Sequence, residues 1–146
     1  MDGNDSLYSS LTPTVALSSL LAGTSVNSGA TVNLTAVAAD PDGTVASVTY
    51  LANGNVVGAA AAAPFAVAWV PGAAGSYTVT AQATENSGNV TASVPVTVTV
   101  NNNRAPTVAV TAPGTGTVVR AGTATNLMST AADADGTITS VQFFAN

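Results

Sequence analysis

Residues 38–53 read AADPDGTVASVTYLAN, and residues 131–146 read AADADGTITSVQFFAN. The match extends toward the N-terminus without a gap, at an offset of 93 residues, so that 20 of the 41 pairs from Pro13/Pro106 to Asn53/Asn146 are identical. Self-similarity at a fixed period is the signature of a repeat architecture. We therefore expect an N-terminal tail over residues 1–11, a complete repeat over 12–104, and the first half of a second repeat, three strands, over 105–146.

Hydrophobic residues in the complete repeat alternate with polar ones at period two, as in Tyr77, Val79 and Ala81. This alternation predicts strands with one buried face. Turn signals such as Asn53-Gly54 separate the runs. The expected strands are 13–18, 31–39, 44–52, 55–59, 64–70, 77–84 and 90–100. Seven short strands in a repeat of this length predict an all-β, immunoglobulin-like antiparallel sandwich.

The same alternation predicts which side chains form the core. Large aromatics fall on the apolar face of their strands rather than on the hydroxylated face, so we expect them to be buried. Tyr77, at the start of its strand, is also placed to bond a nearby turn through its hydroxyl group. The expected core is Val15, Leu34, Val48, Tyr50, Phe65, Trp69, Tyr77, Val79 and Val96.

The composition excludes several classes of function. The chain has no Lys, His or Cys, and its only cations are Arg104 and Arg120. It therefore has no Cys/His zinc site, histidine base or thiol nucleophile, and a net charge of −5 argues against binding nucleic acid. The most apolar segment, 56–70, is shorter than the roughly 20 residues that span a bilayer, and Pro64 interrupts it. We expect neither an enzyme nor a membrane span.

The clustered carboxylates are Asp40 with Asp42 and Asp133 with Asp135, each pair followed by Gly. One interpretation is a turn, because a short Asp side chain caps backbone N–H groups. The other is calcium, which takes six to eight oxygen ligands. In a sandwich of this kind Glu85 lies at the same end as Asp40 and Asp42, so we expect the three to converge. A glycosidase dyad is rejected, because nothing nearby raises the pKa of one carboxyl group.

Taken together, the motifs resemble the bacterial immunoglobulin-like repeat family, within the cadherin-like and fibronectin-like sandwiches. They are Pro-Thr-Val opening a strand, Ala-Asp-x-Asp-Gly-Thr, Ala-Asn-Gly, Pro-Phe-x-Val-x-Trp and Gly-Ser-Tyr-Thr-Val-Thr-Ala. The resemblance implies a non-catalytic module of a secreted or cell-surface bacterial protein. The Asp-x-Asp loop beside Asn101-Asn102-Asn103 is also similar to cadherin repeats. That similarity implies calcium between repeats, although this linker has no Asp.

We expect a spacer repeat whose partners are neighbouring repeats or identical subunits, in an extracellular stalk or filament. The alternatives are an adhesive module that binds sugar or protein, and an accessory domain of a larger secreted hydrolase. Three strands alone leave an apolar face open. Either a neighbouring subunit donates strands to it, giving a head-to-tail polymer, or the sequence is part of a longer chain that completes the fold. The half core would be Val108, Val110, Leu127, Ile138, Val141, Phe143 and Phe144.

Overall fold

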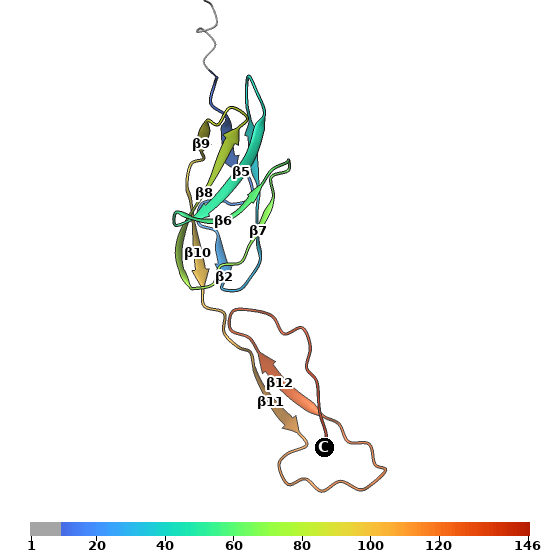
Figure 1. The fold of residues 1–146 in the computed structure, drawn as a ribbon. Coiled ribbons are helices and arrows are strands. Elements are labelled where there is room, and N and C mark those ends of the chain that lie inside the picture. The colour runs from blue at the N-terminus through green and yellow to red at the C-terminus, as the bar shows by residue number, and fades with distance from the viewer. Residues whose placement is uncertain (1–9) are drawn as a thin grey trace, which may run out of the picture. The chain divides into compact units, whose positions relative to one another are not determined.

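The computed structural model describes residues 10–146, so residues 1–9, most of the expected N-terminal tail, lie outside the described part. The chain divides into two compact units, unit 1 (Met1–Asn102) and unit 2 (Asn103–Asn146). The described residues form twelve β-strands and no helix. Figure 1 shows the course of the strands along the chain.

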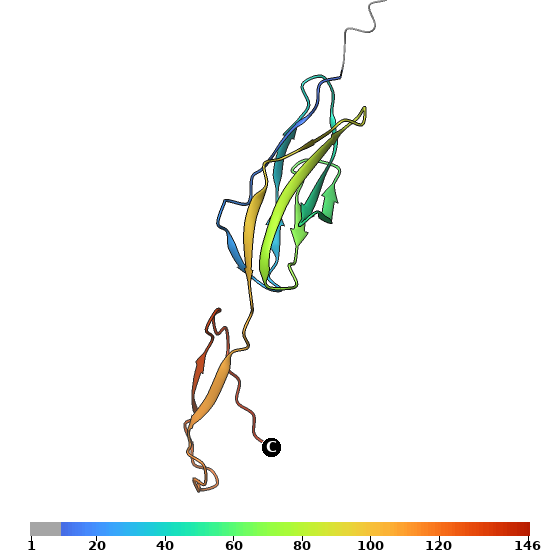
Figure 2. The ribbon, with the colours of Figure 1, turned by 90° about the vertical axis from the view of Figure 1, so that its left-hand side faces the viewer.

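Unit 1 is built around a six-stranded sheet. Its strands are β2 (Ser25–Asn27), β5 (Val45–Ala52), β6 (Asn55–Ala60), β8 (Gly75–Glu85), β9 (Val90–Ala92) and β10 (Val96–Asn101). The order is β2-β10-β8-β5-β6, and β9 pairs with the C-terminal half of β8. Every pair is antiparallel except β2 with β10. Figure 2 shows β8 and β10 side by side. β8 is therefore central to the sheet.

The second layer of unit 1 consists of two strand pairs. β1 (Thr14–Leu17) pairs with β4 (Ala36–Ala39), and β3 (Val32–Leu34) pairs with β7 (Val67–Trp69), both antiparallel. Only Thr35 separates β3 from β4, so one stretch of chain links the two pairs. This arrangement is the all-β, immunoglobulin-like sandwich that the sequence predicts.

The core of unit 1 lies between the two layers and contains the residues that the alternation predicts. Those that are buried are Leu34, Val48, Tyr50, Phe65, Trp69 and Val79. Those that are partly buried and pack against the core are Val15, Tyr77 and Val96. Alternation at period two thus identified the inward face of the strands correctly.

Aromatic side chains tie the two layers together. The rings of Trp69 and Tyr77 meet edge to face, with their centroids 5.4 Å apart. The Tyr77 hydroxyl donates to the Ala73 carbonyl at 2.9 Å, which confirms the predicted bond to a turn. The buried Tyr50 hydroxyl donates to the Phe65 carbonyl. The phenol groups therefore keep a partner while their rings fill the core.

The predicted hairpin at Asn53-Gly54 is present between β5 and β6. Both residues have positive φ, 50° and 79°, as a two-residue turn with the twist of the strands requires. The Asn53 side chain then holds β8, because its Oδ1 accepts the Thr78 N–H at 2.8 Å. This residue supplies both the turn and a link between strands.

The expected strand 31–39 is wrong in its continuity. It breaks at Thr35, whose N–H donates to Ser19 Oγ at 2.9 Å rather than to a backbone carbonyl. The Thr35 carbonyl still accepts the Ser18 N–H at 2.9 Å, in continuation of the β1–β4 register. The side-chain bond ends the backbone ladder at Thr35, and β3 and β4 pair with different partners.

Two further expected strands differ in extent, and one strand was missed. The expected strand 64–70 begins only at Val67, because Phe65 lies in a turn with φ 50°. The expected strand 90–100 is interrupted between β9 and β10, where Ser93 Oγ accepts the Ala81 N–H at 3.0 Å. β2 has only three residues and no alternation to reveal it.

Unit 2 contains one hairpin, β11 (Thr107–Ala112) paired antiparallel with β12 (Met128–Ala132). The expected third strand is absent from the described residues, since 137–146 form no ladder. In unit 1 the matching strand, β5, lies between β6 and β8, and the described residues of unit 2 form no strand in either of these positions. The residues predicted as a half core are exposed, including Leu127 and Phe144.

Replacing Trp69 by Ala is expected to reduce the free energy of unfolding of unit 1 by about 3–5 kcal/mol. Trp69 is only 6% exposed and lies against Tyr77, so truncation leaves a cavity between the layers. Urea denaturation followed by circular dichroism measures the change. Val70→Ala is the matched control, because Val70 follows Trp69 in the chain but its side chain is exposed. Its replacement should change the free energy of unfolding by no more than about 0.5 kcal/mol. Equal effects of the two substitutions would contradict the proposed core.

Candidate functional site

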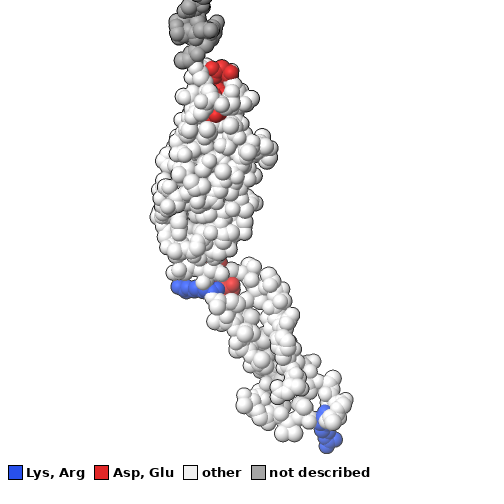
Figure 3. Space-filling model, in the orientation of Figure 1, with Lys and Arg blue, Asp and Glu red and all other residues white. Residues whose placement is uncertain are grey.

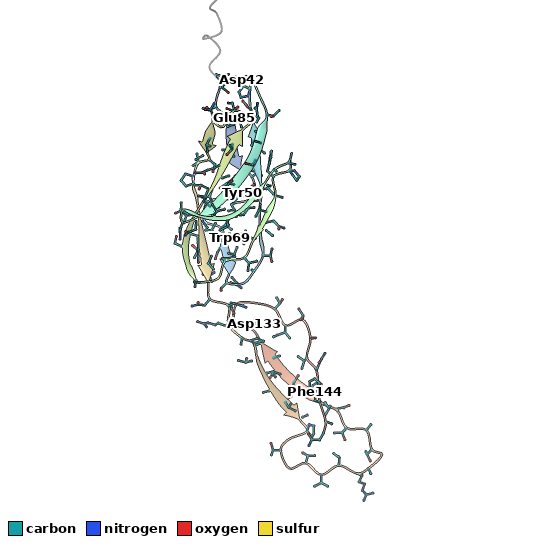
Figure 4. The ribbon with its side chains drawn as sticks, in the orientation of Figure 1. Asp42, Tyr50, Trp69, Glu85, Asp133 and Phe144 are labelled. Atoms are coloured by element: carbon teal, nitrogen blue, oxygen red, sulfur yellow. The ribbon has the colours of Figure 1, made fainter. Side chains whose placement is uncertain are left out.

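Acidic side chains gather at one end of unit 1, where the described chain begins (Figure 3). Asp40 and Asp42 lie in the loop between β4 and β5, and Glu85 ends β8. Asp42 and Glu85 are labelled in Figure 4, far along the sandwich from Trp69. We call Asp40, Asp42 and Glu85, with the residues that bond them, the acidic loop cluster.

Asp42 holds the incoming chain. Its two carboxylate oxygens accept the backbone N–H of Leu11 at 3.1 and 3.0 Å. The Asp42 N–H in turn donates to Asp40 Oδ1 at 3.5 Å, which closes the loop as a side-chain turn. The first described residues are thereby fixed to the loop between β4 and β5.

Gly43 completes the loop through close approach. A Cβ atom at this position would lie 2.5 Å from both Asp40 Oδ2 and Asn86 Oδ1. Asn86 Oδ1 accepts the Thr44 N–H at 2.9 Å, so this amide joins the two loops. The Asp-x-Asp-Gly pattern therefore has a structural reason at each of its three specified positions.

Glu85 is a buried carboxylate, 2% exposed, whose Oε1 atom is surrounded by donors. Oε1 accepts bonds from Ser10 Oγ at 3.1 Å, Asn89 Nδ2 at 2.6 Å, the Asn89 N–H at 3.3 Å and the Ser87 hydroxyl. Bonds to the ionised form favour it. Led by the Ser87 hydroxyl, these donors lower the pKa of Glu85 to about 2, against the opposing effect of burial.

Asp40 is in the opposite situation. Its Oδ2 atom is buried and has no hydrogen-bond donor in the described part of the chain. Burial raises the pKa of Asp40 above its ordinary value, and the neighbouring Glu85 carboxylate adds to the rise. The pair divides its roles, with Glu85 ionised and Asp40 the carboxyl group that takes up a proton more readily.

The structure thus brings Asp40 close to both Asp42 and Glu85, but protein donors already occupy much of the cluster. Asp42 accepts the Leu11 N–H, and Glu85 Oε1 accepts four bonds. Residues 10–146 contain no group of three or more Asp, Glu, His or Cys side chains that could hold a metal ion. The oxygens that already accept these bonds are less open to calcium, which takes six to eight oxygen ligands. The turn and calcium both stay as interpretations, and the thermal unfolding experiment described below distinguishes them.

Asp133 and Asp135 repeat the loop geometry in unit 2. The Asp135 N–H donates to Asp133 Oδ1 at 3.3 Å, and the Asp135 carboxylate accepts the Arg104 N–H at 3.3 and 3.0 Å. Arg104 stands two residues before Pro106, as Leu11 stands two before Pro13. In both loops, the carboxylate of the second Asp accepts a hydrogen bond from a backbone N–H that lies two residues before the Pro that precedes the first strand of the unit.

Sequence reasoning missed the burial of Glu85 and the part played by Ser10, Leu11, Ser87 and Asn89. Glu85 has the same parity as Tyr77, Val79, Ala81 and Ala83, which places it on the inward face of β8. That parity was a usable signal. No pattern could indicate the contacts of Ser10 and Leu11, because they are 75 and 31 residues from their partners.

The low pKa of Glu85 predicts that its contribution to stability is present above about pH 4.5 and is lost as the pH falls toward about 2. Asp40 affects stability in the opposite direction, because its raised pKa means that its charged form destabilises the folded state. Protonation of Asp40 as the pH falls therefore offsets part of the stability that is lost when Glu85 is protonated. Glu85→Gln should therefore destabilise unit 1 near neutral pH, and its difference from wild type should shrink on acidification.

Trp69 is the only tryptophan, so its fluorescence during denaturation at each pH reports the stability of unit 1 alone. Asp135→Asn, a change in unit 2, is the control and should leave the pH profile unchanged. Parallel profiles for wild type and Glu85→Gln would show that Glu85 is not the group responsible.

Comparison with known proteins agrees with the all-β fold. A family model described as "Bacterial Ig domain" matches residues 13–81 and 106–146. The solved Clostridium thermocellum CbhA fibronectin(III)-like modules share the fold, with 23% identity and a TM-score of 0.56, covering 60% of this chain and 94% of that one. An engineered protein aligns with 26% identity and a TM-score of 0.44, covering 61% of this chain and 20% of its own.

No curated protein sequence matches the chain. The 93-residue period stays an inference from the sequence, although the family match begins at Pro13 and again at Pro106. Because the family match covers more than half of the chain and the strands form the corresponding sandwich, this chain belongs to the bacterial Ig domain family.

Proposed function

We propose that the chain is a non-catalytic spacer repeat of a secreted or cell-surface bacterial protein. The observation that carries the proposal is the position of the aromatic side chains of residues 10–102. Tyr50, Phe65 and Trp69 are buried, and Tyr77 is half-buried against them. The large hydrophobic side chains exposed on this unit are all Leu or Val. Within residues 10–102, no exposed aromatic side chain offers a stacking platform for a sugar ring.

The residue inventory also supports a non-catalytic role. With no His, Lys or Cys, the Ser and Thr hydroxyls have no side-chain base of the kind that activates a nucleophile in hydrolases. The carboxyl groups of the acidic loop cluster are engaged with backbone and hydroxyl donors from the loops. Their arrangement serves to hold loops together.

Partners of such a spacer are neighbouring repeats or identical subunits in a stalk or filament. The surface of unit 1 carries few charges, as Figure 3 shows for one face, and Thr, Ser and Ala cover much of it. Residues 10–146 include no helix of the length and apolar character needed to cross a membrane. The spacer differs from the two alternatives in what each requires. An adhesive module requires a sugar or protein ligand, and an accessory domain requires a catalytic domain in the same protein.

Polypeptides carrying one, two and four tandem copies of residues 10–102, which keep Ser10 and Leu11, test the spacer. In small-angle X-ray scattering, the maximum dimension should rise by a constant amount with each added copy, without association at higher concentration. Insoluble polysaccharides should not remove these polypeptides from solution, and oligosaccharides should leave Trp69 fluorescence unchanged. Saturable binding to one polysaccharide would instead support the adhesive module.

Calcium at Asp40, Asp42 and Glu85, or at Asp133 and Asp135, is tested by thermal unfolding in millimolar calcium and in chelator. Because a ligand of the native state stabilises it by mass action, binding would raise the unfolding temperature. Since protein donors occupy Asp42 and Glu85 Oε1, the expected result is no change. A rise that Asp40→Asn abolishes would establish calcium binding at unit 1.

A further inference from the structure

The linker between the two units is held at its N-terminal end by unit 1. Asn101 is the last residue of β10, and it pairs with Asn27 of β2. Its carbonyl accepts the Ser28 N–H at 2.8 Å, and its Nδ2 donates to Ser25 Oγ at 2.7 Å. Backbone and side chain of Asn101 are therefore both fixed to unit 1.

The linker is held at its C-terminal end by unit 2. The Arg104 N–H donates to both carboxylate oxygens of Asp135, at 3.3 and 3.0 Å. Pro106 follows, with its φ fixed by its ring, and it restricts Ala105 to extended backbone. Hydrogen bonds in the described part of the chain hold neither Asn102 nor Asn103.

The same capture occurs at the start of unit 1, where Asp42 accepts the Leu11 N–H with both oxygens. Donor and acceptor are 31 residues apart in both cases. In each loop the N–H of the second Asp bonds the first, and a Cβ on the following Gly would lie 2.5 Å from the first Asp's Oδ2. Two loops with different neighbours therefore build the same contact from the same motif.

We propose that Asp135 is a positioning residue that confines the flexible joint between the units to Asn102 and Asn103. This inference rests on the proposed spacer function, because a short joint limits bending between successive repeats. A carboxylate suits the task, since a charged acceptor makes a stronger bond to an N–H than a neutral one. The contact between the Arg104 N–H and the Asp135 carboxylate is a direct one between protein atoms.

The test uses the full chain with Asp135→Ala and, as a milder change, Asp135→Asn. NMR amide hydrogen exchange and ¹⁵N relaxation are measured in the presence of chelator. In Asp135→Ala the Arg104 amide should exchange at least about tenfold faster. Reduced order parameters should extend from residues 102–103 to residues 102–105. Asp135→Asn, which keeps one acceptor oxygen, should give intermediate values.

Asp42→Ala is the matched control. It should accelerate exchange at the Leu11 amide and leave Arg104 unchanged, whereas Asp135→Ala should do the reverse. If Asp135→Ala unfolds the β11–β12 hairpin, Asp135→Asn decides the question on a folded unit 2.

An Arg104 amide that exchanges equally fast in wild type and in Asp135→Asn would overturn the proposal, as would protection that appears only with calcium. Polysaccharide binding by unit 1 would refute the spacer function while leaving these amide measurements as they are, so the two failures are distinguishable.

Discussion

The pairing of β5 with β8 is the contact on which the rest of unit 1 depends. β8 lies in the middle of the large sheet and pairs with β5, β9 and β10. Its inward face supplies Val79, Ala81 and Ala83 to the core. The β5 residues opposite them, Ala52, Tyr50 and Val48, are buried as well. The same two strands therefore provide both a backbone hydrogen-bond ladder and a large part of the buried apolar side chains.

Unit 2 shows what happens to a closely similar sequence without that pairing. Residues 138–145, ITSVQFFA, correspond to β5, VASVTYLA, yet they form no strand. Phe143 and Val141 stand where Tyr50 and Val48 are buried in unit 1, and both are exposed. Strand propensity is therefore insufficient here, because a strand gains most of its stability from neighbours on its edges and face.

The acidic loop cluster gives the Asp-x-Asp-Gly motif a mechanical interpretation. One carboxylate closes the loop, the next captures the incoming chain, and glycine allows both to approach. Glu85 joins the second loop and the first described residues to this assembly through Ser10, Ser87 and Asn89. The end of the sandwich at which the chain arrives is thus built from polar contacts, whereas its middle is built from apolar ones.

Sequence alone determined the fold class and the inward face of most strands, because period-two alternation is a local property that burial on one side enforces. It also identified the Asn53-Gly54 turn and the Tyr77 hydroxyl bond, which depend on residues a few positions apart. It could not show that Thr35 breaks a strand, that Ser10 donates to Glu85, or that Asp42 and Asp135 hold backbone N–H groups 31 residues away. Tertiary structure decided these features, since each depends on which distant segments packing brings within hydrogen-bonding distance.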